Sequence, residues 1–387
     1  MLQSMSQLEY HFNRHHHYPW HFFSEIAFTP AFINATSSAT DAPTFYHLIP
    51  RAHWSMPNFI SRHRFMQSLD YVGALGVGKG HMVSYRHMCR WNSRFFYRHP
   101  ALRDYDYYWR VEPDVHFFCS IPYDPFALFA AFGFVYGFNM AILDDARSFP
   151  SLWPATRDFV AKNRHLLHPE ADPAWLFDLD PVGGGIDSVY NNCQFFSNFE
   201  LGDLNFFRGN YSSSSGSKND NYYYTMAAHD LYVRHLDHLG GFFYERFGDA
   251  PIHTLSVSLF APRDRVWWFG DIGYQHDSTR HCPPPSFYSS SPSEKHEKKT
   301  QQQHPQLCAC EPTPLDENFY KLVPMQSPQR KPADTCLRMW LERSRWFGGS
   351  GGSGNGKGWL EKKPGWDRDV ELAWGGDGYG GYVRHGL

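Results

Sequence analysis

The chain has 387 residues, a formal charge of −3 and 42% hydrophobic residues, which is enough apolar material for one large domain or two ordinary ones. Its 36 basic and 39 acidic side chains are balanced, so we expect no nucleic-acid partner and no general attraction to an anionic membrane. The sequence contains neither an apolar run of about 18 residues nor a signal-peptide pattern, so taken alone it predicts no membrane span.

The sequence pattern of the first half of the chain predicts short strands and helices in alternation. Residues 18–60 alternate short aromatic runs with proline and polar breakers, which predicts short strands joined by loops. From Ser84 to Phe96 the apolar positions recur at helical spacing, and Ser84 is a suitable cap for the helix this predicts.

A run of strand-forming residues at 105–111 is followed at once by Glu112-Pro113-Asp114, where proline must end the strand pairing. Helical patterns around 125–132 and 150–165 continue an α/β alternation. In open α/β sheets ligands bind beyond the carboxyl ends of strands, so the two carboxylates lie where a site is expected.

The tripeptide Glu112-Pro113-Asp114 offers two hard oxygen ligands, which suit Mg²⁺ or Mn²⁺ bridging a nucleotide diphosphate. Such a metal would neutralise charge that builds up on the leaving diphosphate. The same acid-proline-acid pattern also occurs in ordinary turns, so the motif by itself leaves both interpretations open.

Three further polar residues stand in aromatic or strand-like surroundings. Glu200, within Asn198-Phe199-Glu200, is either a buried functional carboxylate or an acid satisfied by main-chain donors at a helix start. Asp249, in a Gly-Asp-Ala-Pro turn, either contacts sugar hydroxyls or caps the next helix. His276 follows a strand-like run and could complete a metal site, or could be structural.

Composition also separates the predicted domain from its appendages. Two stretches, at about 211–227 and 283–305, are polar and resemble surface insertions. Residues 347–387 form a glycine-rich tail that should be flexible, so the predicted domain covers 1–346. The seven cysteines show no repeated Cys-x-x-Cys pattern, which argues against a zinc ribbon.

Five blocks of the sequence, in the same order, resemble the fungal α-1,2-mannosyltransferases of glycosyltransferase family 15. These yeast Golgi enzymes extend O-linked and N-linked mannans. The resemblance runs from about Leu8 to Cys336, apart from the two insertions. Its most specific blocks are residues 84–90, 107–115, 197–200, 244–251 and 271–276.

The resemblance implies a single GT-A-type α/β domain, with a mixed central sheet flanked by helices, that moves mannose from GDP-mannose to a mannosylated glycoprotein or oligosaccharide. It also implies Mn²⁺, an α-1,2 linkage and retention of configuration. Location in the Golgi lumen as a type II membrane protein is implied as well. The family's anchor, stem and first strand precede the point where Leu8 begins, so this chain is expected to lack them and to contact the membrane only through such an anchor.

Three residues at the reaction centre follow from the resemblance, position by position. Glu112 matches the metal-ligating acid of the family's Glu-Pro-Asp motif, and His276 matches the histidine that joins it on the metal. Glu200 matches the candidate nucleophile, which fits retention if a mannosyl-enzyme forms. A same-face reaction without that intermediate stays open.

The remaining assignments concern substrate contacts. Tyr85 and Arg86 lie in the helix that resembles the family's donor and acceptor wall. Arg110 and Asp114 flank the metal acid and could hold diphosphate or ribose, while Asp249 is assigned to the catalytic group. In the oxidising lumen some of the cysteines are expected to pair, and their odd number leaves at least one thiol over.

Two alternatives remain from the sequence. One is a catalytically impaired fragment or a non-catalytic mannan-binding relative. The other is an unrelated metal-dependent hydrolase, which would need more than two protein ligands on its metal. The main interpretation requires Glu112, Glu200 and His276 to converge although they lie far apart in the chain.

Overall fold

The computed structural model describes residues 1–176, 189–209, 228–283, 308–310 and 336–343. The insertion predicted at about 211–227 and the tail 347–387 lie outside the described residues, as does all but Pro283 of the insertion at about 283–305. Within the described part of the chain, no helix is both long and apolar enough to cross a membrane.

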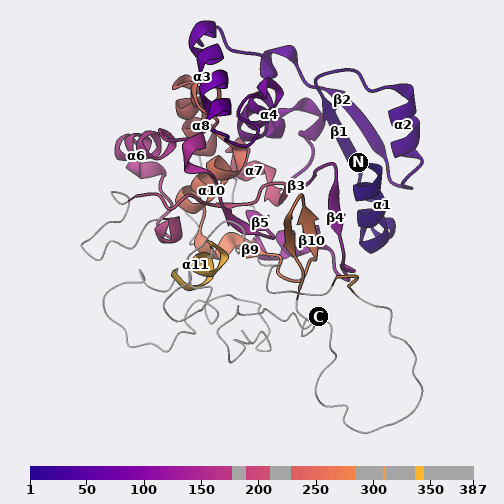
Figure 1. Ribbon diagram of the computed structural model, residues 1–387. Coiled ribbons are helices and arrows are strands. Elements are labelled where there is room, and N and C mark those ends of the chain that lie inside the picture. Colours follow the sequence, from indigo (N-terminus) through magenta and orange to yellow (C-terminus); the bar gives the residue numbers. More distant parts are fainter. Residues whose placement is uncertain (177–188, 210–227, 284–307, 311–335, 344–387) are drawn as a thin grey trace, which may run out of the picture.

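Helices and strands are interspersed along the chain, and Figure 1 shows their arrangement. The α-helices are α1 (Leu2–His11), α2 (Pro30–Ser37), α3 (Arg62–Ala74), α4 (Val83–Arg94), α5 (Pro125–Phe132), α6 (Leu152–Lys162), α7 (Leu204–Arg208), α8 (Ala228–His238), α9 (Gly241–Tyr244), α10 (Asp249–Phe260) and α11 (Cys336–Arg343). The strands are β1 (Trp20–Ser24), β2 (Thr44–Leu48), β3 (Tyr107–Val111), β4 (Val115–Phe117), β5 (Tyr136–Phe138), β6 (Ala141–Leu143), β7 (Cys193–Phe195), β8 (Phe199–Asp203), β9 (Val266–Trp268), β10 (Tyr274–His276) and β11 (Thr279–His281).

The N-terminal segment forms a separate layer, in which β1 pairs in parallel with β2. The short strands predicted within residues 18–60 are therefore confirmed, but α2 between them was not predicted. Helix α2 begins as expected for its sequence, with Thr29 accepting a hydrogen bond from the Phe32 amide and Pro30 in the first turn. Figure 1 shows this layer at one side of the molecule, together with α1.

The predicted helices near 84–96, 125–132 and 150–165 are confirmed as α4, α5 and α6. Helix α4 begins one residue before Ser84, and its cap position is Met82, which makes no side-chain cap hydrogen bond. The strand predicted at 105–111 is β3, and its residues are half-buried.

The central sheet has the strand order β3-β8-β5-β9. Strands β3 and β5 run antiparallel to β8, whereas β9 runs parallel to β5, so the sheet is mixed as predicted. A second sheet, β11-β10-β4, carries the segment that follows β3. These two sheets bring residues near 110, 200 and 276 into one region of the fold.

A hydrophobic core covers each face of the central sheet. In β8, Phe199 and Leu201 pack with residues of β4 and α5, while Glu200 points to the opposite face. That opposite face is covered by the apolar sides of α4, α8 and α10, and Tyr136 and Phe138 of β5 belong to its core. Glu200 is therefore a carboxylate placed on the side of the sheet that is most fully covered by helices.

Three disulfides join elements that are distant in sequence, which confirms that some cysteines pair. They are Cys119–Cys308, Cys193–Cys336 and Cys282–Cys310. Cys89 in α4 is the remaining thiol, and it is buried. All seven cysteines lie in the described residues, and Cys89 is the one that forms no disulfide.

Candidate active site

Strand alternation brings four polar side chains to one face of the central sheet. Tyr108 and Arg110 in β3 are two residues apart, and Arg110 lies directly opposite Glu200 in β8. Tyr136 of β5 pairs with Gly202, which also pairs with Tyr108. A Cβ atom at position 202 would lie 2.6 Å from the Tyr108 ring, so glycine there leaves room for this tyrosine.

Glu200 is fully buried, and its carboxylate accepts hydrogen bonds from side chains rather than from a helix start. The Tyr108 hydroxyl donates to Oε1 at 3.0 Å, and the Tyr136 hydroxyl donates to Oε2 at 2.8 Å. His253 Nδ1 lies 2.9 Å from the same Oε2. The alternative of an acid satisfied by main-chain donors is therefore wrong for Glu200.

His253 was not singled out by the sequence analysis. It lies in α10, four residues after Asp249, so the two side chains share one helix face. Its Nε2 is 3.1 Å from the main-chain oxygen of Asn92 in α4. Burial alone would lower the pKa of His253, but the charge and hydrogen bond of Glu200 outweigh burial and raise it.

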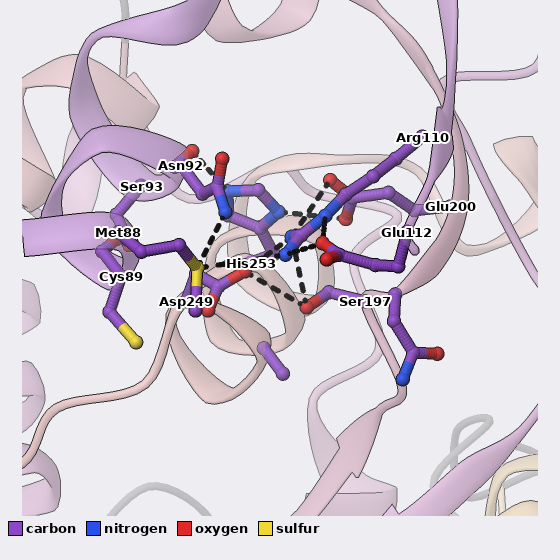
Figure 2. Close-up of polar contacts among 12 residues, drawn as sticks. Met88, Cys89, Asn92, Ser93, Arg110, Glu112, Ser197, Glu200, Asp249 and His253 are labelled. Atoms are coloured by element: carbon purple, nitrogen blue, oxygen red, sulfur yellow. Dashed lines mark hydrogen bonds and ion pairs between the residues drawn. The ribbon is translucent and has the colours of Figure 1, made fainter. Parts of the chain in front are cut away.

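Arg110 lies at the centre of the site, among the acids that it contacts, as Figure 2 shows. Its Nε donates to Glu112 Oε1 at 2.6 Å and its Nη1 donates to Asp249 Oδ2 at 2.5 Å. The same Nη1 lies 4.0 Å from Glu200 Oε1. Burial lowers the pKa of Arg110, but the three carboxylates together raise it well above its usual value.

This geometry bears on the role predicted for Arg110. The guanidinium donates hydrogen bonds to Glu112 and Asp249 and lies 4.0 Å from Glu200, so the predicted contact with diphosphate or ribose stays a prediction that would require some of these pairs to open. Its function in this conformation is to hold the acids together.

Asp249 is the first residue of α10, and Gly248 occupies the cap position. Ser197 Oγ donates to Asp249 Oδ2 at 3.1 Å, on the same oxygen that Arg110 contacts. Burial would raise the pKa of Asp249, but the positive charge of Arg110 prevails and lowers it. Asp249 is thus an ionised acid inside the cluster.

Glu112 and His276 lie at the more open side of the cluster, with side chains that are 28% and 19% exposed. Pairing of β10 with β4 sets His276 opposite Val115, three residues after Glu112. Burial lowers the pKa of His276, and the negative charges of Asp277 and Glu112 oppose that shift. The charge of Glu112 therefore acts on the imidazole.

The two residues fit a divalent metal by their chemistry. His276 Nδ1 is buried without a hydrogen-bond partner, although Asp277 Oδ2 lies 3.6 Å away. A neutral imidazole and a partly exposed carboxylate are a donor pair that Mn²⁺ accepts. Asp114, two residues beyond Glu112, is exposed and has a left-handed backbone with φ of 59°.

The predicted helix residues Tyr85 and Arg86 have different surroundings. Tyr85 is half-buried, and its hydroxyl accepts a hydrogen bond from Arg246 at 3.2 Å. Arg86 is fully buried and donates to the main-chain oxygens of Gly80, Phe242 and Phe243. This position leaves Arg86 no surface for substrate, so its predicted substrate contact is corrected to a structural role between α4 and α9.

The hydrolase alternative finds no support in the part of the chain that the structure describes. The one group there with three potential metal-ligating side chains is Cys119, Cys308 and Cys310, and all three sulfurs belong to disulfides. By contrast, Glu112, Glu200 and Asp249 converge on the guanidinium of Arg110. The negative charge of Glu112 also acts to raise the pKa of His276. Of the three residues that the main interpretation requires to converge, Glu112 and Glu200 meet at Arg110, and His276 lies opposite Val115, three residues after Glu112.

Comparisons with known proteins point to one family. Residues 1–311 match the family described as glycolipid 2-alpha-mannosyltransferase. The O-glycoside alpha-1,2-mannosyltransferase omh1 of Schizosaccharomyces pombe is 36% identical over 283 residues, covering 73% of this chain and 67% of the relative. The alpha-1,2 mannosyltransferase KTR1 of Saccharomyces cerevisiae is 38% identical over 283 residues, which are 73% of this chain and 66% of KTR1.

Solved structures agree with the sequence comparisons. Core-mannan synthase A (CmsA/Ktr4) of Aspergillus fumigatus, in its Mn/GDP form, is similar with a TM-score of 0.66 and 39% identity, over 78% of this chain and 75% of that one. The mannosyltransferase Ktr4p of S. cerevisiae in complex with GDP is similar with a TM-score of 0.70 and 31% identity, over 89% of this chain and 78% of Ktr4p.

Proposed function

Because the chain belongs to the glycolipid 2-alpha-mannosyltransferase family, the fungal α-1,2-mannosyltransferases, we propose that it transfers mannose from GDP-mannose to a mannosyl acceptor on a glycoprotein or oligosaccharide. We further propose that the reaction forms an α-1,2 linkage with retention and depends on Mn²⁺. The Mn/GDP form of the Aspergillus relative and the GDP complex of the yeast relative support a GDP-bearing donor and a divalent metal.

The observation that carries this proposal is the meeting of three acids at Arg110. Glu112 directly follows β3, Glu200 lies in β8 and Asp249 begins α10, and Arg110 lies within 4.0 Å of each. Clusters of buried ionisable residues with shifted pKa values are typical of catalytic sites. A surface binding module would not need to place two buried carboxylates and a partly exposed third around one cation.

Within the cluster, Glu112 and His276 would hold the metal, which when bound offsets negative charge on the leaving diphosphate. The partly exposed side chains of these two residues make them available to a ligand. Asp114 is exposed beside them and is proposed to contact diphosphate or ribose, while Tyr85 is proposed to line the donor and acceptor wall.

Glu200 and Asp249 are proposed as the acids nearest to the reacting carbon. Retention through a mannosyl-enzyme requires a Glu200 oxygen to attack the anomeric carbon. Glu200 is fully buried and both of its oxygens accept hydrogen bonds, so this route requires the neighbouring side chains to shift and expose one oxygen when GDP-mannose binds. A same-face reaction needs no such movement, and there the carboxylate acts through its fixed negative charge.

The test is a transfer assay with GDP-mannose, Mn²⁺ and an α-mannoside acceptor. The wild-type chain should give a product whose linkage and anomeric configuration are α-1,2 by NMR. Glu200→Gln should abolish transfer and leave metal-dependent GDP binding intact in calorimetry, whereas Asp158→Asn, an exposed helix acid, should change neither. Loss of both transfer and GDP binding in Glu200→Gln would instead make Glu200 a structural acid.

A non-catalytic mannan-binding relative is the competing function. Such a scaffold would bind mannan without any heat of GDP binding that depends on Mn²⁺. The placement of the partly exposed Glu112 and His276 at the edge of a cluster with two buried acids favours the enzyme, because a scaffold has no need of such a cluster.

We also propose that the chain works in the lumen of the Golgi, as a type II membrane protein of the kind the family resemblance implies. The three disulfides support an oxidising compartment, because structural disulfides seldom persist in the cytosol. Immunolocalisation of the native protein beside a Golgi marker tests this location.

A further inference from the structure

His253 occupies a position where both ring nitrogens face acceptors. Its Nε2 is 3.1 Å from the main-chain oxygen of Asn92, which can only accept, so Nε2 carries a proton. Its Nδ1 is 2.9 Å from Glu200 Oε2. One proton therefore lies between His253 and Glu200, bound either to the imidazole or to the carboxyl group.

The other partners of Glu200 decide where that proton lies. The hydroxyls of Tyr108 and Tyr136 both direct their protons to the Glu200 oxygens, and such bonds are strongest to an ionised carboxylate. Arg110 Nη1, at 4.0 Å, adds a positive charge on the same side. These contacts favour a carboxylate facing an imidazolium.

We propose that His253 is a positioning residue that carries a proton on both ring nitrogens and thereby holds Glu200 as a fixed carboxylate beside Arg110. This proposal rests on the proposed transfer reaction. Arg110 alone faces three acids, and a positively charged His253 brings a second cation to the cluster. The net charge beside the donor site would then depend on His253 as well as on Arg110, Glu112, Glu200 and Asp249.

The charged or titratable groups that face His253 come from every side. Glu200 faces it from β8, Asp249 from its own helix and Arg110 from β3. His229 of α8 lies with its ring centroid 5.7 Å away. The raised pKa of His253 agrees with the geometry, since the two carboxylates outweigh burial and Arg110.

His229 is a matched control within the same core. Like His253 it is fully buried, and its Nε2 faces a main-chain oxygen of α4, that of Ser93 at 2.9 Å. Its Nδ1, however, faces the hydroxyl of Ser256 at 2.8 Å instead of a carboxylate. Burial lowers the pKa of His229 well below 6.5, so this imidazole stays neutral.

The protonation states can be read by NMR of the full chain labelled with ¹⁵N-histidine, with His253→Asn and His229→Asn used to assign the two signals. We expect the imidazolium pattern for His253 to persist at pH values above about 6.5, the ordinary histidine pKa, and the neutral pattern for His229. A neutral His253 at pH 7 would overturn the proposal whether or not the chain transfers mannose.

Kinetics separate positioning from mere structural support. Loss of a partner that orients a reacting group typically lowers activity about 10- to 100-fold, so His253→Asn should lower kcat to that extent with little change in the KM for GDP-mannose. His229→Asn should leave kcat and its pH profile unchanged. Equal effects of the two variants on kcat would show that the core, and not the charge of His253, is responsible.

A separate observation concerns the sequence Asn34-Ala35-Thr36, which is an acceptor pattern for N-linked glycans. Asn34 lies in α2 with an exposed side chain, beside Ile33, which is 37% exposed. The Thr36 hydroxyl is buried and lies 2.7 Å from the Tyr46 hydroxyl, so the pattern is accessible as a whole only before α2 packs on β2.

We infer that Asn34 carries an N-linked glycan added before the N-terminal layer folds. This rests on the proposed luminal location. A glycan there projects from the outer side of α2 and covers apolar surface such as Ile33, while the buried side of the helix keeps its packing against β2.

The test is mass spectrometry of the native protein before and after endoglycosidase treatment. A glycan should be found on Asn34, lost in Asn34→Gln and kept in Thr36→Ser. The second acceptor pattern, at Asn210, reports whether the chain entered the lumen at all. A glycan at Asn210 with bare Asn34 would overturn this inference and leave the location intact, whereas no glycan together with reduced cysteines would overturn both.

Discussion

Arg110 Nη1 donates a hydrogen bond of 2.5 Å to Asp249 Oδ2, although the two residues are 139 positions apart. This bond ties the end of β3 to the start of α10, the helix that covers the central sheet. Because the same guanidinium contacts Glu112, one cation fixes the relative positions of a strand end and a helix start.

Arg110→Met should strongly destabilise the fold, since it leaves Asp249 as a buried charge without its nearest cation and removes a second cation from the surroundings of Glu200. Removing one partner of a buried ion pair typically costs about 3–5 kcal/mol in the free energy of unfolding. Chemical denaturation with the disulfides intact measures this loss. The matched control is Arg147→Met, which removes an exposed pair with Asp145 and should leave the free energy of unfolding almost unchanged.

Glu112→Gln and His276→Gln should each weaken Mn²⁺-dependent binding of GDP, because each removes one of the two proposed ligands. Calorimetry of GDP with and without Mn²⁺ measures the effect. Asp277→Asn is the control, since Asp277 lies 3.6 Å from His276 but is 77% exposed. If Asp277→Asn lost metal-linked binding and His276→Gln kept it, the assignment of the metal ligands would be wrong.

The family, the mixed sheet with its covering helices and the enzyme class were predicted from the sequence and are confirmed. Helices such as α5 and α6 were predictable because their apolar spacing and proline positions act locally. Helix α2 was missed because it lies within a run rich in strand formers.

The candidate site was less predictable, because its contacts depend on how distant strands pair. Glu200 was singled out by its aromatic surroundings, but the hydroxyls that bind it come from Tyr108 and Tyr136, which no local pattern connects to it. His253 was missed although its spacing of four residues from Asp249 was a usable signal. Arg86 was misjudged because an arginine on a helix gives no sign of being buried against main-chain oxygens.

The disulfide Cys193–Cys336 should contribute substantially to stability, because it closes a loop of 143 residues. Loop-closure entropy gives about 5 kcal/mol for such a span, as an upper estimate. The double variant Cys193→Ser/Cys336→Ser should therefore lower the melting temperature, although stacking of Arg263 on Trp340, 3.5 Å from the ring centroid, still helps to hold α11. Differential scanning calorimetry measures the shift.

A thiol count of the wild-type chain tests the disulfide pairing on which that prediction rests. With all three disulfides formed, the denatured wild-type chain should show one reactive thiol, that of Cys89, and the folded chain should show none because Cys89 is buried. More than one thiol in the denatured, unreduced chain would contradict the pairing.

The stability contributed by His253 should be lost at alkaline pH. Its pKa is raised in the folded state, mainly because the charge of Glu200 outweighs burial, so the contribution is complete below about pH 6.5 and disappears as the pH rises through the folded pKa. The difference in unfolding free energy between the wild type and His253→Asn should therefore be largest near pH 6 and should shrink towards pH 9.

His229 should show the opposite dependence. Burial depresses its pKa, so its contribution is present above about pH 6.5 and is lost as the pH falls, when the unfolded chain takes up a proton that the folded chain does not. Urea denaturation of the wild type, His253→Asn and His229→Asn at several pH values measures both trends. The two imidazoles share the same core and the same burial, so opposite slopes would arise from their charged surroundings: Glu200 faces Nδ1 of His253 with Asp249 nearby, whereas the Ser256 hydroxyl faces Nδ1 of His229. Parallel slopes would mean that Glu200 does not hold His253 in its charged form.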